Sequence, residues 1–83
     1  MDESGVFEIV KAQVLAVLPD LDEKSLKYDA QLADLGANSI DRVEVATFSQ
    51  QELGIMVPSE KLAGVNNIGD LVRLLHATLK QSS

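Results

Sequence analysis

The stretch DLGANSIDRVE, residues 34–44, decides the fold, because it joins a turn to the start of a helix. Gly36 permits the turn, since glycine adopts backbone angles that other residues avoid. Asn38 and Ser39 are residue types that cap the N-termini of helices. The apolar spacing that follows predicts a helix over residues 39–53.

This helix has apolar residues on two faces. At about 100° per residue, the core-facing side collects Val45, Ala46, Ser49 and Leu53. The opposite side collects Ile40, Val43, Glu44, Thr47 and Gln51. A helix of a small domain rarely needs apolar residues on its outer side unless a partner docks there. We therefore expect a docking surface that begins one residue after the serine.

The chain before this helix predicts a first helix and a long loop. Apolar residues recur at helical spacing after Ser4, which we expect to be the N-cap, and Pro19 and Asp20 close the helix. Residues 19–38 then form a connection of a length that is often functional. Its apolar anchors are Leu21, Leu26, Tyr28, Leu32 and Leu35.

The chain after the central helix predicts two more helices. Gly54 is the C-terminal stop, and Pro58 suits the first turn of a short helix near residues 59–64. Asn66 and Asn67 cap a last helix that carries an apolar stripe, and residues 81–83 are expected to fray. We expect an all-α bundle of four helices in a single domain that spans residues 1–83.

Composition excludes several classes of protein. The 83 residues contain no cysteine, so neither a disulfide framework nor a thiolate metal site is possible. No apolar run approaches the roughly 18 residues of a membrane span, and the acidic N-terminus does not resemble a signal peptide. The net charge of −6 argues against nucleic acid and favours partners with basic patches. We expect a cytoplasmic protein that is a monomer by itself and has no membrane partner.

The residues also argue against an enzyme. His76 is the only histidine, and its place late in the last helix is an ordinary one. The carboxylates lack the spacing of metal ligands, and we expect so short a chain to have little room for a substrate cleft of the usual size. We therefore expect no catalytic residue and no metal.

The segment from Asp34 to Val45 resembles the modification site of acyl and peptidyl carrier proteins, in which a serine follows an Asp/Glu-Leu-Gly turn. The resemblance extends over nearly the whole chain, including Leu-Gly-Ile-Met-Val-Pro at residues 53–58. It implies the four-helix acyl-carrier fold. It also implies that a phosphopantetheinyl transferase attaches 4′-phosphopantetheine to the Ser39 hydroxyl.

Three residues depart from that family pattern or have two interpretations. Asn38 replaces the acidic residue that commonly precedes the serine, so ordinary transferases are expected to act less efficiently on this chain. Arg42 projects toward the core side. Either its head pairs with a nearby carboxylate, or it contacts the phosphate of the arm or a dedicated partner. Met56 either fills a gap in the core or contacts a partner.

Residues 36–45 and 66–72 further resemble the freestanding carriers of polyketide β-branching cassettes. That resemblance implies an acetyl donor to an HMG-synthase-like enzyme, with a ketosynthase or acyltransferase as other partners. Asn38 and Arg42 would then distinguish donor from acceptor carriers. The alternatives are a fatty-acid or peptidyl carrier and an unmodified helical adaptor. The expected docking residues are Asn38, Ile40, Arg42, Val43, Glu44, Thr47 and Met56.

Overall fold

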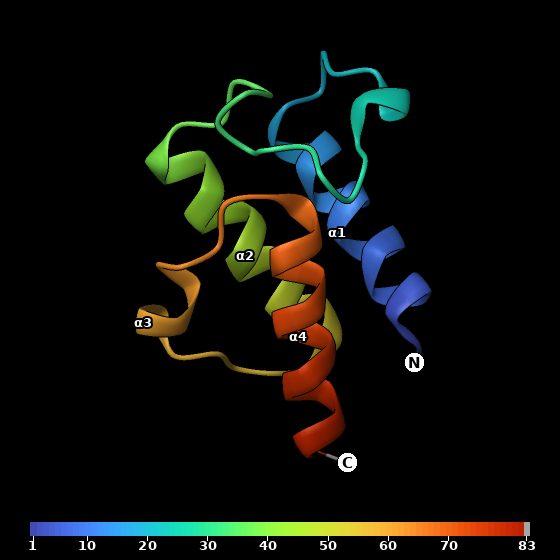
Figure 1. Cartoon of the computed structure of the whole chain (residues 1–83), viewed down its shortest axis with the longest axis vertical. Helices are drawn as coiled ribbons and strands as arrows, with labels where there is room; N and C mark the ends of the chain where they lie inside the picture. Colours follow the sequence, from blue (N-terminus) through green and yellow to red (C-terminus); the bar gives the residue numbers. More distant parts are fainter. Residues whose placement is uncertain (83) are drawn as a thin grey trace.

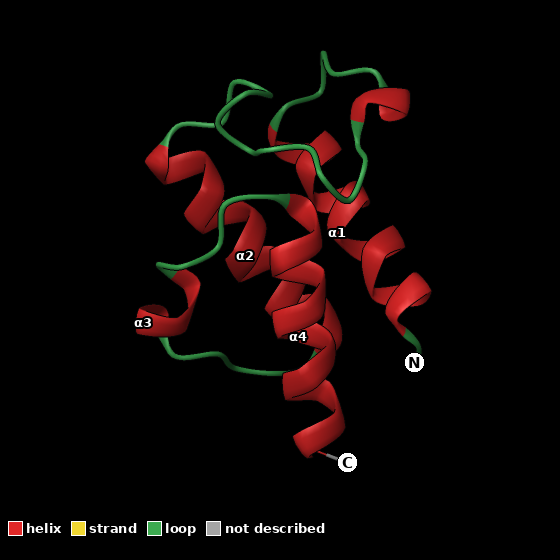
Figure 2. Cartoon of the chain, viewed as in Figure 1, coloured by secondary structure: helices red, strands yellow, loops and turns green. Residues whose placement is uncertain are grey.

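The computed structural model describes residues 1–82, in which helices are joined by loops (Figure 2). The elements are α1 (Glu3–Val17), the short 3₁₀ helix η1 (Glu23–Ser25), α2 (Ser39–Leu53), α3 (Ser59–Leu62) and α4 (Ile68–Ser82). The described residues form no β-strand, only one isolated bridge between Gln31 and Asn67. None of their helices is long and apolar enough to cross a bilayer. The all-α prediction is confirmed.

Three long helices surround one core, and α3 lies to the side (Figure 1). Helix α1 packs against both α2 and α4 and runs in the direction opposite to both. The loop between α1 and α2 crosses the end of the bundle where α2 and α4 begin. The buried hydrophobic residues of the helices are Val6, Val10, Val14, Val45, Ala46, Ile68, Leu71, Val72 and Leu75. This core is aliphatic, in keeping with an aromatic content of only 4%.

The N-cap of helix α1 lies two residues earlier than predicted. Asp2 is the N-cap, and its carboxylate accepts the backbone N–H of Gly5 at 2.8 Å. The prediction that Ser4 caps α1 is therefore wrong. Aspartate and serine cap about equally well, so residue type alone does not distinguish them. The helix ends at Val17, just before Pro19, as expected.

The long loop is held to the bundle by the predicted anchors. Leu26 and Leu32 are buried, and Leu21 and Leu35 are half-buried against the core. The ring of Tyr28 packs on Phe7 of α1, with centroids 4.4 Å apart. Burial of these side chains fixes the loop, so its far end presents α2 at a defined place.

The same loop supplies acceptors for the first turn of α4. The carbonyl oxygens of Ala30 and Tyr28 accept the N–H groups of Ile68 and Gly69 at 3.0 and 2.8 Å. These donors have no partner within the helix and would otherwise be unpaired. A Cβ on Gly69 would lie only 2.8 Å from the Tyr28 carbonyl oxygen, so the close approach depends on glycine.

The predicted cap of α4 is confirmed at Asn67. Its side-chain oxygen accepts the N–H of Asp70 at 2.7 Å, and the Asp70 carboxylate accepts the N–H of Asn66 at 3.4 Å. Hydrogen bonds lower the pKa of Asp70 below its usual value: the bond from Arg73 has the largest effect, and the bond from the Asn66 backbone has a smaller one. Helix α4 continues to Ser82, so the prediction of a frayed tail is wrong for residues 81 and 82. Ser83 lies outside the described residues.

Candidate functional site

The start of α2 is built by a turn and a reciprocal cap. Gly36 has a φ of 95°, which favours glycine. The Asn38 side chain accepts the N–H of Asp41 at 2.8 Å, and the Asp41 carboxylate accepts the N–H of Asn38 at 3.2 Å. This capping box makes Asn38 the N-cap and Ser39 the first helical residue. The cap predicted at Asn38 is confirmed, whereas Ser39 does not cap the helix. The exposed Ser39 hydroxyl therefore does not stabilise the start of α2.

Arg42 lies one turn further along α2, and its head reaches back to the serine. Its Nη2 donates to Ser39 Oγ at 3.4 Å. No carboxylate within residues 1–82 lies within ion-pair distance of Arg42, so of its two interpretations the pairing with a carboxylate is wrong. The reason is local: Asp41 is held by the capping box, and Glu44 projects from the opposite side of the helix.

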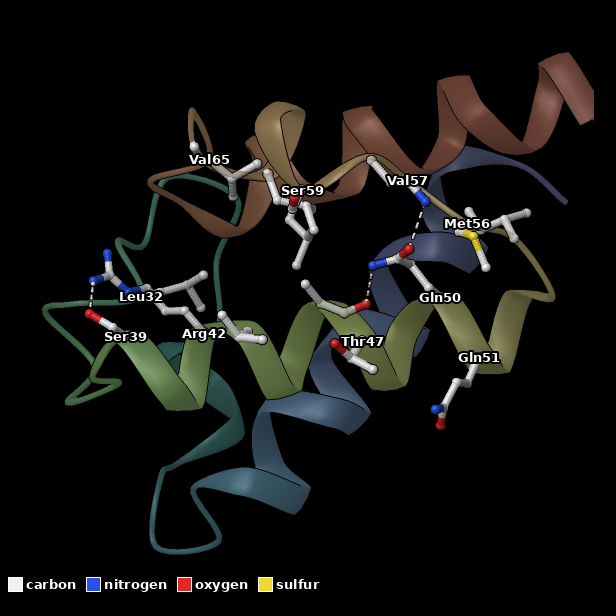
Figure 3. Close-up of a pocket in the computed structure, with 16 residues that line it drawn as sticks. Leu32, Ser39, Arg42, Thr47, Gln50, Gln51, Met56, Val57, Ser59 and Val65 are labelled. Atoms are coloured by element: carbon white, nitrogen blue, oxygen red, sulfur yellow. Dashed lines mark hydrogen bonds between the residues drawn. The ribbon is translucent and has the colours of Figure 1, made fainter.

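A groove with a volume of about 700 Å³ runs between α2, α3 and the segment that leads into α4. Ser39 and Arg42 stand at one end of it and Met56 at the other (Figure 3). Its lining residues are Leu32, Ser39, Arg42, Val43, Ala46, Thr47, Gln50, Gln51, Ile55, Met56, Val57, Ser59, Leu62, Ala63, Val65 and Leu71. The expectation that so short a chain lacks room for a cleft is wrong, because the four-residue α3 stands beside α2 without filling the space between them.

One side chain fixes the far wall of the groove. Gln50 accepts the N–H of Val57 at 2.7 Å through Oε1, and its Nε2 donates to the carbonyl of Ala46 at 3.2 Å (Figure 3). The two bonds tie the segment before α3 to α2. Sequence reasoning missed this role: the helical period places Gln50 beside Ala46, but nothing local indicates that residue 57 is its partner.

The predicted docking residues divide into two groups. Ser39, Arg42, Val43, Thr47 and Met56 line the groove. Asn38, Ile40 and Glu44 lie outside its lining and are exposed to solvent.

Exposure of the apolar members agrees with the predicted outer face. Ile40 is 68% exposed, Val43 63% and Met56 87%. Met56 therefore does not fill the core. Phe48, which was assigned to no face, is 40% exposed on the flank beside Glu44.

The predicted core face of α2 is confirmed. Val45, Ala46 and Ser49 are buried and Leu53 is half-buried. The hydroxyl of Ser49 is the one exception to good pairing there, since it has no hydrogen-bond partner in the described chain. The core face and the groove thus use different sides of one helix.

The site is suited to an anionic group that is covalently attached to the Ser39 hydroxyl. Within residues 1–82 no three His, Asp or Glu side chains gather closely enough to hold a metal. The Ser39 hydroxyl is exposed, and the adjacent Arg42 guanidinium has no carboxylate partner. Guanidinium groups and helix N-termini both favour phosphate. These residues fit a phosphoester on Ser39.

Comparisons with known proteins agree with this geometry. The family model for the phosphopantetheine attachment site matches residues 8–75. The polyketide biosynthesis acyl-carrier-protein AcpK of Bacillus subtilis is 38% identical over 76 residues, which cover 92% of this chain and 93% of that protein. The acyl carrier protein of Clostridium acetobutylicum is 34% identical over 73 residues, covering 87% of this chain and 94% of the relative. Because the family match extends from α1 into α4, this chain belongs to the acyl carrier proteins, which carry phosphopantetheine and are not enzymes.

Proposed function

We propose that Ser39 carries the 4′-phosphopantetheine arm and that the protein delivers acyl groups in polyketide biosynthesis, as the acetyl donor to an HMG-synthase-like β-branching enzyme. The observation that carries the attachment site is the exposed Ser39 hydroxyl at the first residue of α2. It lies inside the region that matches the phosphopantetheine attachment model.

The surroundings of Ser39 suit the attachment reaction. In a phosphopantetheinyl transferase, Ser39 Oγ attacks the pyrophosphate of coenzyme A. An Oγ–P bond forms, the bond to adenosine 3′,5′-bisphosphate breaks, and the hydroxyl proton passes to a base of the transferase. The backbone N–H groups of Ser39 and Ile40 have no acceptor among the described residues, and free N–H groups at a helix N-terminus favour an anion such as the attached phosphate. Once attached, the arm supplies a thiol that holds an acyl group as a thioester.

The polyketide assignment is supported by the likeness to AcpK, whose name places that protein in polyketide biosynthesis. The donor role is supported by residues 36–45 and 66–72, which resemble the freestanding carriers of β-branching cassettes. The exposed apolar side chains of Ile40, Val43 and Met56 offer such an enzyme a surface that relies little on charge. The partners are therefore a phosphopantetheinyl transferase, the HMG-synthase-like enzyme, and a ketosynthase or acyltransferase that loads the arm.

The attachment site is tested by the mass of the intact protein. Co-expression with a broad-specificity transferase adds one phosphopantetheine, and Ser39→Ala abolishes the gain. Ser59→Ala is a matched control, because Ser59 is the exposed first residue of α3 and lines the same groove. A mass gain retained in Ser39→Ala overturns the site, and no gain in the unaltered chain would favour an unmodified adaptor.

The donor role needs a second experiment. The acetyl-loaded protein is mixed with an HMG-synthase-like enzyme and a second carrier that holds an acetoacetyl group, and the mass of the second carrier is followed. The expected result is addition of the acetyl unit to that carrier. If the enzyme accepts a fatty-acid carrier equally well, or does not accept this chain, the donor role fails while the carrier role stands.

A further inference from the structure

We propose that Arg42 is a positioning residue that binds the phosphate formed on Ser39 and so sets the direction in which the arm leaves α2. The inference rests on the proposed attachment at Ser39. It assigns to this chain a phosphate contact of its own, in addition to contacts made by partner enzymes.

The geometry already brings the two groups together. Arg42 Nη2 lies 3.4 Å from Ser39 Oγ, the atom that would bear the phosphorus. The charged oxygens of a phosphodiester are two bonds from that atom, within reach of a guanidinium that already contacts it. A long contact to a neutral hydroxyl is weak, whereas the same donor to a phosphate is charge-assisted and can be bidentate.

The charge around Arg42 points the same way. The chain carries a net charge of −6, yet the Arg42 head has no carboxylate within ion-pair distance in residues 1–82. Arg73 is different, since it donates to Asp70 at 2.9 Å. A guanidinium that is not neutralised and lies beside the attachment serine can bind phosphate without first breaking an ion pair.

Burial limits how far Arg42 can move away. Its side chain is half-buried and lines the groove beside Val43 and Ala46. Less conformational freedom is then lost when the head binds an anion than for a fully exposed arginine. The phosphate is then held at the end of the groove where α2 begins, and the arm leaves α2 from this end.

The direct test compares the arginine side-chain signals of the apo and phosphopantetheinylated protein by NMR. Mass spectrometry first establishes that the unaltered chain has gained the arm at Ser39. Failure at this step overturns the proposed attachment at Ser39, and with it the phosphate that Arg42 would bind. The Arg42 side-chain signal, assigned by its loss in Arg42→Gln, is expected to shift on modification. The Arg73 signal is expected to stay in place.

A stability comparison adds a second readout. Urea unfolding is measured for both forms of the unaltered chain, Arg42→Gln, Arg42→Lys and the matched control Arg73→Gln. Modification is expected to raise the folding equilibrium constant, and to raise it about two- to fivefold more in the unaltered chain than in Arg42→Gln, as for an exposed ion pair. This difference should be smaller in high salt. Arg42→Lys should retain part of the gain, and Arg73→Gln all of it.

The outcomes are separable. An unshifted Arg42 signal, or a modification effect that is equal in the unaltered chain and Arg42→Gln, overturns the phosphate contact and leaves Arg42 as a contact for partner enzymes. Should Arg42→Gln fail to fold or to accept the arm, the NMR comparison on the unaltered chain, with Arg42→Lys to assign the signal, still decides.

Discussion

Removal of the Gln50 side chain should loosen the wall of the groove and destabilise the fold. In Gln50→Ala the N–H of Val57 loses its 2.7 Å acceptor, and Val57 is only 5% exposed. A buried donor left unpaired costs about 1–3 kcal/mol. Water can enter through the open groove and offset part of that cost, so we expect a loss of about 1–2 kcal/mol. For a chain of this length that corresponds to a fall of roughly 4–16 °C in the melting temperature.

The neighbouring residue provides the control. Gln51 carries the same side chain on the same helix, is exposed and makes no side-chain hydrogen bond among the described residues. Gln51→Ala should therefore change stability by less than about 0.5 kcal/mol. Urea unfolding gives the two free energies, and hydrogen exchange of the Val57 amide reports the lost bond. Equal stabilities for the two variants, or unchanged exchange at Val57, would refute the assigned role of Gln50.

The capping box predicts that Asn38→Ala lowers the free energy of unfolding by about 0.5–2 kcal/mol, whereas Ser39→Ala, which removes no cap, costs less; equal losses in a urea titration would contradict this assignment. Gly69→Ala should destabilise the fold by about 1–3 kcal/mol, because its new Cβ meets the backbone of the long loop. Gly64→Ala should not, because its new Cβ would make only an ordinary contact, 4.0 Å from the Lys61 carbonyl oxygen; similar melting temperatures for the two would argue against the close approach. The lowered pKa of Asp70 stabilises the fold above the unfolded value near 3.8, and this contribution is lost as pH falls through the lower folded value. In Asp70→Asn the free energy of unfolding should therefore fall less steeply as the pH is lowered. An unchanged fall would contradict the bond between Arg73 and the Asp70 carboxylate.

Local signals in the sequence predicted most of the fold. The bounds of α2 follow from Asn38 at one end and Gly54 at the other, and Gly54 indeed has a φ of 68°. The two faces of α2 follow from the helical period alone. Each of these features depends on residues within one or two turns of each other, where propensity and periodicity carry information.

The groove and its wall, which sequence reasoning missed, depend on contacts between separate segments of the chain. The groove exists because α3 is short and stands beside α2, and its wall is held by Gln50 through Val57, seven residues away. Of the two interpretations of Arg42, the pairing with a carboxylate is wrong, since the helical period fixes the direction of a side chain and not the atom it meets. Chain length did not predict the groove either, because the groove depends on where α3 lies relative to α2.

The division of labour between Asn38 and Ser39 explains how a modification site can sit on a core helix without weakening it. The bonds that start α2 belong to Asn38 and Asp41, and its buried face begins at Val45. If the hydroxyl of Ser39 were the cap, a bulky phosphoester on it would remove a bond worth about 1 kcal/mol. Because the cap belongs to the preceding residue, attachment would disturb a single side-chain hydrogen bond among residues 1–82, the long one from Arg42 to Ser39. That contact is the one that the phosphate would strengthen, so both the folded bundle and the proposed arm are accommodated by the same first turn.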